Sequence, residues 1–297
     1  MKYLLLLILP LFLLECKKEE DTIIENPPTD LSTSVEYKQM DSISSNLLSL
    51  DIYYNSLTEQ KKPVVLYVHG GGWSIGDKSS QIENKISLFQ SLDYLFVSIN
   101  YRLSPFPFEP NNSNRIKFPA HNNDVADAIK WVINNISKYG GDQNKIALLG
   151  HSAGAHLVSL TATNSTFLTN VGLNFSNIKG VAAIDTEGYD VLSQVQNNNA
   201  LYINAFGIDT NSNAQASPIL NLTSGISYPK FFIAKRGSSG RIARADNFIN
   251  TLVLNGVSVS QIDGSIYDHS GINDAIGKPN ETLITNALKQ FLTECFQ

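Results

Sequence analysis

Short apolar runs that alternate with helical patterns are the feature that most constrains how this chain can fold. The clearest runs cover residues 63–70, 95–102 and 145–150, and all three are rich in Val, Ile or Leu. Strands with so few polar positions are buried on both faces, which is typical of parallel strands in an α/β sheet. Residues 121–140 instead repeat apolar side chains every three or four positions, which predicts an amphipathic helix. The alternation predicts an α/β fold, a mostly parallel sheet with helices on both faces.

The remaining segments extend this pattern. Further strands are expected at residues 46–55, 178–185, 230–235 and 257–263, and further helices at 80–92, 241–254 and 281–293. Residues 188–228 are too long for a plain connection, so we expect a small cap there. In a parallel sheet ligands bind beyond the carboxyl ends of the strands, so functional residues are expected directly after a strand.

Composition narrows the class of protein. A chain of 297 residues with 42% hydrophobic residues can form one large domain with a substantial core. The net charge of −5 and the lack of a Lys/Arg-rich run argue against a nucleic-acid partner. The segment 236–241 (RGSSGR) lacks the Gly-Lys-Ser/Thr ending of a phosphate-binding loop.

The N-terminus predicts export. Lys2 precedes an almost unbroken apolar run over residues 4–14, which is too short for a membrane-spanning helix but fits a secretory signal. The run ends at Leu-Glu-Cys16, which resembles a bacterial lipobox, although Glu15 stands where a small residue is usual. We expect residues 1–16 to be a signal peptide, residues 17–34 a linker and residues 35–297 the folded domain. Cys16 would then anchor the protein to the bacterial outer membrane or cell surface through a lipid, the alternative being a plain signal peptide.

Ser152 is the candidate nucleophile. It lies in Gly150-His-Ser152-Ala-Gly154, which follows a buried strand and begins a small-residue helix. This is the setting of a nucleophile elbow, where a sharp turn strains the serine backbone and the two glycines avoid a clash. The N-terminus of the following helix would favour negative charge that develops beside the serine.

A second special loop follows another central strand. In His69-Gly-Gly71-Gly72-Trp73 the glycines let backbone N–H groups approach a substrate closely. We expect the N–H groups of Gly71, Gly72 and Ala153 to form an oxyanion hole. Trp73 is the candidate lining residue of the substrate pocket. Leu201, Tyr202 and Phe206 of the cap can also reach such a pocket, although each fits the core equally well.

These motifs resemble the α/β-hydrolase superfamily. The resemblance is carried by KPVVLYVHGGGWSIGDKSS, NYRLSP, FPAHNNDVADAIKWV, YGGDQNKIALLGHSAGAHL and ASPI, within residues 46–290. It is most similar to His-Gly-Gly-Gly carboxylesterases of the hormone-sensitive-lipase-like and BD-FAE-like groups. The resemblance implies an eight-stranded, mostly parallel sheet and hydrolysis of short-chain acyl esters without a cofactor or metal.

The general base is expected among five histidines, His69, His121, His151, His156 and His269. His69 belongs to the glycine loop, His151 sits beside Ser152 but is expected to face elsewhere, and His156 should point away from the site. His121 is interpreted as a surface or capping residue. His269 alone follows the last predicted strand, which is where the resemblance places the base.

The catalytic acid is where the chain departs from the resemblance. Related enzymes carry the acid after the second-last strand, but here that segment, residues 231–241, offers only Ser238 and Ser239. The next carboxylate along the chain is Asp246, which is expected on an outward-facing helix surface.

Two carboxylates after the preceding strand offer a substitute. Asp185 is nearest to the strand end and is the first choice, Glu187 is the second and Asp246 the third. Some lipases of the superfamily resemble this arrangement. A base that becomes an imidazolium needs such a partner.

The sequence therefore predicts a serine carboxylesterase that acts on a small-molecule or polysaccharide-borne ester. One alternative is an amidase of the arylformamidase type, which shares these motifs. Another is a catalytically impaired surface lipoprotein that only binds its ligand. The oligomeric state stays open.

Overall fold

The computed structural model describes residues 31–54, 60–106, 112 and 114–297. The predicted signal segment, Cys16 and most of the predicted linker lie outside these residues. No helix in the described part of the chain is long and apolar enough to cross a membrane.

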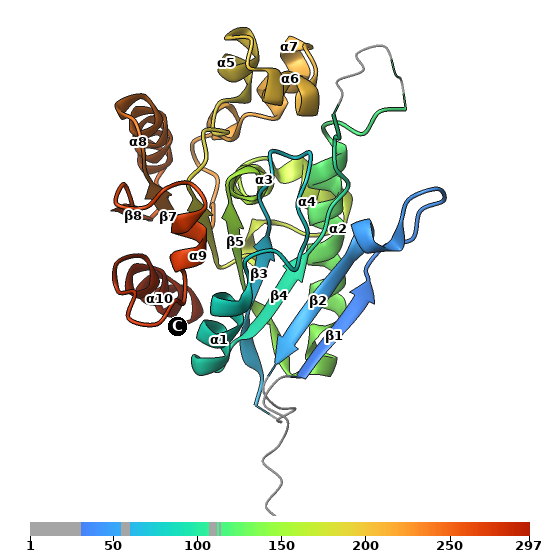
Figure 1. The fold of residues 1–297 in the computed structure, drawn as a ribbon, viewed down its shortest axis with the longest axis vertical. Helices are drawn as coiled ribbons and strands as arrows, with labels where there is room; N and C mark the ends of the chain where they lie inside the picture. The colour runs from blue at the N-terminus through green and yellow to red at the C-terminus, as the bar shows by residue number, and fades with distance from the viewer. Residues whose placement is uncertain (1–30, 55–59, 107–111, 113) are drawn as a thin grey trace, which may run out of the picture.

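One mixed sheet organises the described residues (Figure 1). Its eight strands lie in the order β1-β2-β4-β3-β5-β6-β7-β8. The strands are β1 (Leu31–Glu36), β2 (Ser49–Tyr54), β3 (Lys62–Val68), β4 (Leu95–Ile99), β5 (Gly141–His151), β6 (Gly180–Ile184), β7 (Lys230–Lys235) and β8 (Val259–Asp263). β2 pairs antiparallel with β1 and β4, and all other pairs are parallel. The predicted eight-stranded, mostly parallel sheet is confirmed.

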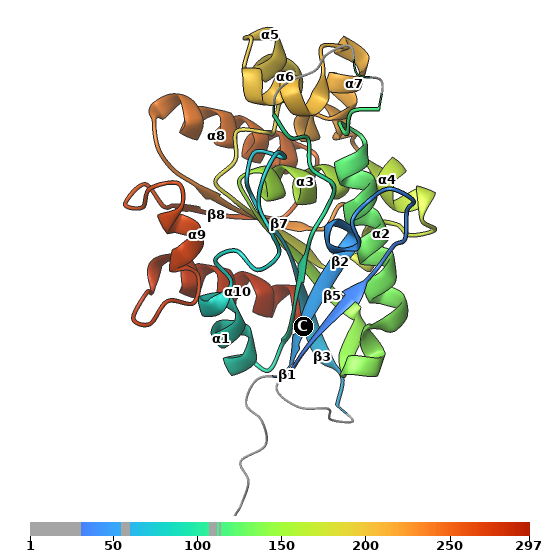
Figure 2. The same cartoon turned by 45° about the vertical axis from the view of Figure 1, so that its right-hand side comes forward.

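Helices cover both faces of this sheet (Figure 2). The α-helices are α1 (Glu83–Ser91), α2 (Ala120–Asn135), α3 (Ala153–Thr161), α4 (Ser165–Asn170), α5 (Val191–Gln196), α6 (Ala200–Phe206), α7 (Thr210–Gln215), α8 (Ser239–Leu254), α9 (Gly271–Ala275) and α10 (Leu283–Phe296). Short 3-10 helices are η1 (Ser45–Leu48), η2 (Ile136–Tyr139), η3 (Phe175–Asn177) and η4 (Pro218–Asn221).

Two apolar layers form the core, one on each side of the sheet. The larger layer packs α2, α3 and α8 against the sheet, for example through Val125, Leu157 and Phe248. The smaller layer packs α1 and α10 against the other face, for example through Phe89 and Phe291. Cys295 of α10 is a buried thiol in this second layer and forms no disulfide with another described residue.

The predicted cap is a group of short helices. α5, α6, α7 and η4 all lie between β6 and β7 in the sequence, and α5 to α7 form the group at the top of Figure 1. Tyr202 and Phe206 are buried beneath this group, whereas Leu201 is 36% exposed.

Two sequence expectations need correction here. Residues 31–34 were expected in the linker, but they belong to β1, where Val35 pairs with Leu50 of β2. The three consecutive polar residues Ser32, Thr33 and Ser34 give this edge strand no apolar run by which the sequence could reveal it. The segment 46–49 was expected in a strand, but most of it is η1, and β2 begins at Ser49.

Candidate active site

Ser152 lies in the sharp turn between β5 and α3. Its backbone is left-handed, with φ 55° and ψ −117°, a strained conformation for a residue that has a Cβ. Gly154 makes the turn possible, because a Cβ at this position would lie 2.0 Å from the carbonyl oxygen of Val68. The N–H of Ser152 donates to Ile184 O at 2.9 Å, which ties the turn to the end of β6. The turn thus has the strand–turn–helix form that the sequence predicts.

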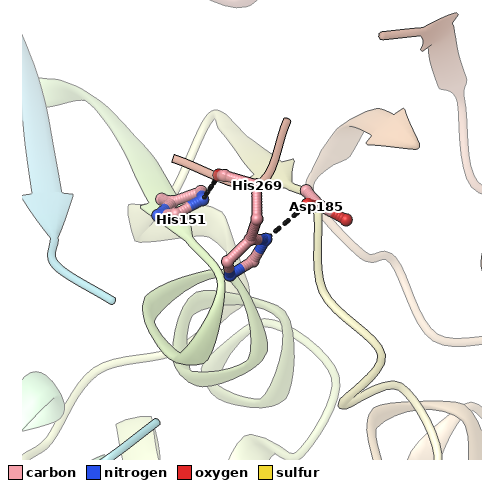
Figure 3. A group of neighbouring side chains, drawn as sticks. All are labelled: His151, Asp185 and His269. Carbon is pink, nitrogen blue, oxygen red and sulfur yellow. Dashed lines mark hydrogen bonds and ion pairs between the residues drawn. The ribbon is translucent and has the colours of Figure 1, made fainter. Parts of the chain in front are cut away.

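His269 lies within hydrogen-bond distance of Ser152, although the two are far apart in the sequence. His269 Nε2 is 2.9 Å from Ser152 Oγ. On the other side of the ring, Nδ1 is 2.5 Å from Asp185 Oδ2, as Figure 3 shows. An ionised carboxylate can only accept, so Nδ1–H donates to Asp185 and Nε2 accepts from the serine hydroxyl. His269 follows β8, as expected, and its carbonyl accepts a hydrogen bond from His151 Nε2 at 2.8 Å.

Asp185 is the carboxylate that contacts His269. It follows β6 directly, is 3% exposed, and has a left-handed backbone with φ 47°. Two guanidinium groups also contact it, Arg236 Nη1 at 2.7 Å from Oδ2 and Arg241 Nη2 at 2.6 Å from Oδ1. Burial alone would raise the pKa of Asp185, but the hydrogen bonds from His269 and Arg241 and the charge of Arg241 lower it. The carboxyl is therefore an anion at neutral pH.

The other two carboxylate candidates contact arginine or lysine side chains and not His269. Glu187 binds Arg241 and Arg244, the latter at 2.8 Å. Asp246 lies on α8 and binds Lys235. Within the described residues, neither has a hydrogen bond with His269. Arg236 and Arg241 are site residues that the sequence did not predict. The segment 236–241 carries no motif that marks its arginines as partners of a carboxylate elsewhere in the chain.

The glycine loop after β3 faces the same place. A Cβ on Gly70 would lie 3.1 Å from Ser152 Cβ, so the loop backbone closely approaches the nucleophile. Gly71 and Gly72 both have positive φ, 104° and 59°. Among the described residues the N–H groups of Gly71 and Gly72 have no hydrogen-bond acceptor, and Ala153 N–H is at the start of α3, where a helix leaves its N–H groups free. These three donors are available to a negatively charged oxygen.

A cavity of about 400 Å³ opens at this place. It is lined by the glycine loop, by Ser152, His151 and His269, by the apolar side chains of Ile75 and Leu201, and by polar residues that include Tyr67, Gln81, Ser270 and Asn273. Leu201 confirms that the cap reaches the site. This polar wall, formed by Tyr67 of β3, Gln81 before α1, Ser270 before α9 and Asn273 of α9, was not expected from the sequence.

Trp73 does not line this cavity, so the prediction of a pocket residue is wrong. Its side chain is buried beneath the cap, where the ring packs edge-on against Tyr202 and Phe206. Its Nε1–H donates to His156 Nδ1 at 3.2 Å. A large ring that follows three glycines turns inward here, because Trp73 too has a positive φ, 58°.

The remaining histidines are buried and neutral. Burial lowers the pKa of His151 and His121 to about 3, and that of His156 to about 4. His156 points away from the site, as expected, and binds Ala216 O at 2.9 Å. The expectation for His121 is wrong: it lies inside α2, fully buried, with Nε2 2.8 Å from Ser104 Oγ.

One group of side chains has the composition of a metal site. His151, Asp185 and His269 each offer a ligand atom within 4.8 Å of the others. However, His151 Nε2 and His269 Nδ1 donate their hydrogens to oxygen, and Arg236 and Arg241 already contact Asp185. A cation would face two guanidinium groups here, so the group fits a hydrogen-bonded chain better than a metal site.

The BD-FAE family model matches residues 50–228, which are more than half of the 297-residue chain. The chain belongs to the BD-FAE family. Among curated proteins, Esterase LipQ of Mycobacterium tuberculosis is 42% identical over 106 residues, which is 36% of this chain and 23% of LipQ. Para-nitrobenzyl esterase of Bacillus subtilis is 30% identical over 146 residues, 47% of this chain and 30% of that protein. The chain thus matches less than a third of the length of either relative.

Solved structures extend the likeness to most of the chain. An inhibited form of Esterase B from Lactobacillus rhamnosis superposes with a TM-score of 0.73 at 19% identity, over 91% of this chain and 88% of that chain. A truncated carbohydrate esterase from gut microbiota gives a TM-score of 0.69 at 17% identity, over 91% and 98%. At these identities the likeness shows the fold.

Proposed function

We propose that this BD-FAE family member is a serine carboxylesterase that cleaves short-chain acyl esters through an acyl-enzyme intermediate. The observation that carries the proposal is the position of His269 between Ser152 Oγ, at 2.9 Å, and Asp185 Oδ2, at 2.5 Å. The names of the curated relatives, an esterase of Mycobacterium tuberculosis and para-nitrobenzyl esterase of Bacillus subtilis, support the same reaction.

The proposed chemistry follows from these three side chains. Ser152 Oγ attacks the ester carbonyl carbon while His269 Nε2 takes its proton. The tetrahedral intermediate then expels the alcohol, which receives that proton, and leaves an acyl group on Ser152. Water repeats the two steps and releases the acid. Asp185 keeps the His269 ring oriented and stabilises the imidazolium between the steps.

Two further features suit this role. Gly71 and Gly72 line the same cavity as Ser152, and Ala153 follows Ser152 in the chain, which supports the proposal that their N–H groups stabilise the oxyanion of each tetrahedral intermediate. The cavity of about 400 Å³, with Ile75 and Leu201 as its apolar lining, favours a short acyl chain over a long fatty chain.

Labelling and turnover together test the proposal. The wild-type protein should react with a fluorophosphonate probe and hydrolyse p-nitrophenyl acetate. Ser152→Ala should abolish labelling and lower kcat by about a millionfold. A wild-type protein that is folded by circular dichroism but neither labels nor turns over contradicts the esterase proposal.

We also propose that the protein is exported and anchored to the bacterial outer membrane or cell surface through a lipid on Cys16. The apolar run at residues 4–14, followed by Leu-Glu-Cys16, supports this proposal. Incorporation of radiolabelled palmitate into the wild type but not into Cys16→Ala is the expected result. Equal incorporation in both would contradict it.

A further inference from the structure

The carboxylate behind His269 is held by an unusual set of cations. Asp185 contacts Arg236 and Arg241, and Arg241 also contacts Glu187, which in turn binds Arg244. Three arginines thus meet two carboxylates. Asp185 is only 3% exposed, and the side chains of Arg236 and Arg241 are 15% and 24% exposed, so water screens their contacts weakly.

Each arginine also ties Asp185 to a different part of the site. Arg236 follows β7 and donates from Nε to Tyr267 O at 3.1 Å, in the loop that carries His269. Arg241 lies in the first turn of α8 and contacts both Asp185 and Glu187, which are two residues apart in the sequence.

We propose that Arg241 and Arg236 are positioning residues that fix Asp185 toward His269 and partly neutralise the negative charge that this carboxylate presents to the His269 ring. This inference rests on the proposed esterase function. It assigns Glu187 a role as well, which is to hold Arg241 rather than to serve as the acid.

The reasoning is electrostatic. A carboxylate beside a catalytic histidine favours the imidazolium form, because it places an anion next to the proton that the ring gains. Two guanidinium cations on the far side of the carboxylate oppose that effect, and burial makes the opposition stronger. The two arginines therefore reduce the stabilisation that Asp185 gives to the imidazolium form of His269.

Other charged or titratable groups face Asp185 from every neighbouring element. They are His151 at the end of β5, Glu187 and Tyr189 after β6, Arg236 after β7, Arg241 on α8 and His269 after β8. Lys85 of α1 acts at a distance on His151. His151 is neutral over the working pH range, because burial holds its pKa at about 3. The arginines are therefore the groups whose removal changes the charge around Asp185 most.

The pH dependence of kcat/KM for p-nitrophenyl acetate tests this inference. In Arg241→Gln the midpoint of the acid limb should rise by about half to one pH unit, because Asp185 regains its full effect on His269. On the plateau, kcat should fall about tenfold to a hundredfold, because Asp185 loses one of its anchors. Arg236→Gln should change both quantities in the same directions, and it supplies the measurement if Arg241→Gln does not fold.

Two control variants separate charge from geometry. Arg241→Lys keeps the cation but cannot bind Asp185 and Glu187 at once, so its acid limb should stay near that of the wild type while kcat falls. Arg244→Gln removes a cation that contacts Glu187 but not Asp185. In this variant kcat should stay within about twofold of the wild type, and the midpoint of the acid limb within about 0.2 pH unit.

The outcomes distinguish this inference from the esterase proposal. If the wild type labels with fluorophosphonate and hydrolyses the ester, the function stands whatever the arginine variants do. An acid limb that is unchanged in folded Arg241→Gln and Arg236→Gln overturns the inference, even if kcat falls, since a merely structural role would lower the rate without moving the limb.

Discussion

The two halves of the candidate site are built in different ways. Ser152 and the glycine loop are positioned by backbone, through a left-handed turn after β5 and positive φ angles after β3. Asp185 and His269 are positioned by side chains, through a chain of ion pairs that joins β6, β7, α8 and the loop after β8. The backbone half carries no charged side chain, because burial lowers the pKa of His69 in the glycine loop, whereas the side-chain half consists mostly of charges. Changes of pH and of charge should therefore act on one half, and changes of shape on the other.

The largest loss of activity is expected for one of the two carboxylates in the side-chain half. Asp185→Asn leaves His269 with the wrong partner and should lower kcat about ten-thousand-fold in a p-nitrophenyl acetate assay. Glu187→Gln removes a charge two residues away that contacts only arginines among the described residues, and should cost less than tenfold. Similar losses in both variants would contradict the assignment of Asp185, and an unchanged Asp185→Asn would move the acid elsewhere.

A smaller but still large effect is expected in the backbone half. A Cβ on Gly71 would lie 2.0 Å from Ile75 O, and the φ of 104° is unfavourable for any other residue. Gly71→Ala should therefore displace the loop and lower kcat/KM about a hundredfold to a thousandfold, as loss of an oxyanion donor does. The loss should be the same from pH 6 to pH 9.

Gly172 provides the matched control for this variant. It also has a positive φ, 71°, but a Cβ there would meet nothing within 4 Å, and it lies in the turn after α4. Gly172→Ala should lower the midpoint of thermal unfolding slightly and leave kcat/KM unchanged. If Gly71→Ala behaves in the same way, the glycine loop is not an oxyanion hole.

The contrast between the halves also explains what the sequence could predict. Ser152 and the glycine loop depend on local backbone geometry, so their residues stand close together in recognisable motifs between residues 69 and 154. The fold could be predicted for the same reason, because buried strands such as β3 and β5 are short apolar runs. The edge strand β1, whose residues are mostly polar, was the exception.

The side-chain half could be predicted only in part. The position of Asp185 after a strand made it the first choice, but its contact with His269 spans 84 residues of the chain. Nothing local marks Arg236 and Arg241 as partners of Asp185, because ion pairs between distant segments leave no spacing in the sequence. Trp73 failed for a related reason: whether a side chain after a glycine turns inward depends on a positive φ that the sequence does not reveal.

Lys85 extends the comparison to the other side of the loop that carries His269. This lysine of α1 is fully buried, and its Nζ donates to Gln81 O at 2.9 Å and to Asn273 O at 2.6 Å. Unlike Arg236 and Arg241, it has no carboxylate in contact among the described residues. Burial therefore lowers the pKa of Lys85 to about 7, although Asp274 and Glu83 at a distance oppose the shift. Here a cation is held by two carbonyl groups and by the face of the Tyr67 ring, whose centroid lies 5.3 Å from Nζ, and its charge is lost near neutral pH.

The smallest expected effect concerns stability. Between pH 7 and the ordinary lysine pKa of about 10.4, the unfolded chain binds a proton at Lys85 that the folded protein does not. The free energy of unfolding should therefore rise with pH in this interval, by about 1 kcal/mol per pH unit from this group. Lys85→Met lacks that contribution, so urea unfolding at pH 7, 8 and 9 should give a flatter curve for the variant. Other groups titrate alike in both proteins and cancel in the difference. Parallel curves would mean that Lys85 stays charged in the folded protein. A buried cation that contacts carbonyl groups and an aromatic ring would then be as insensitive to pH as the arginines that bind Asp185.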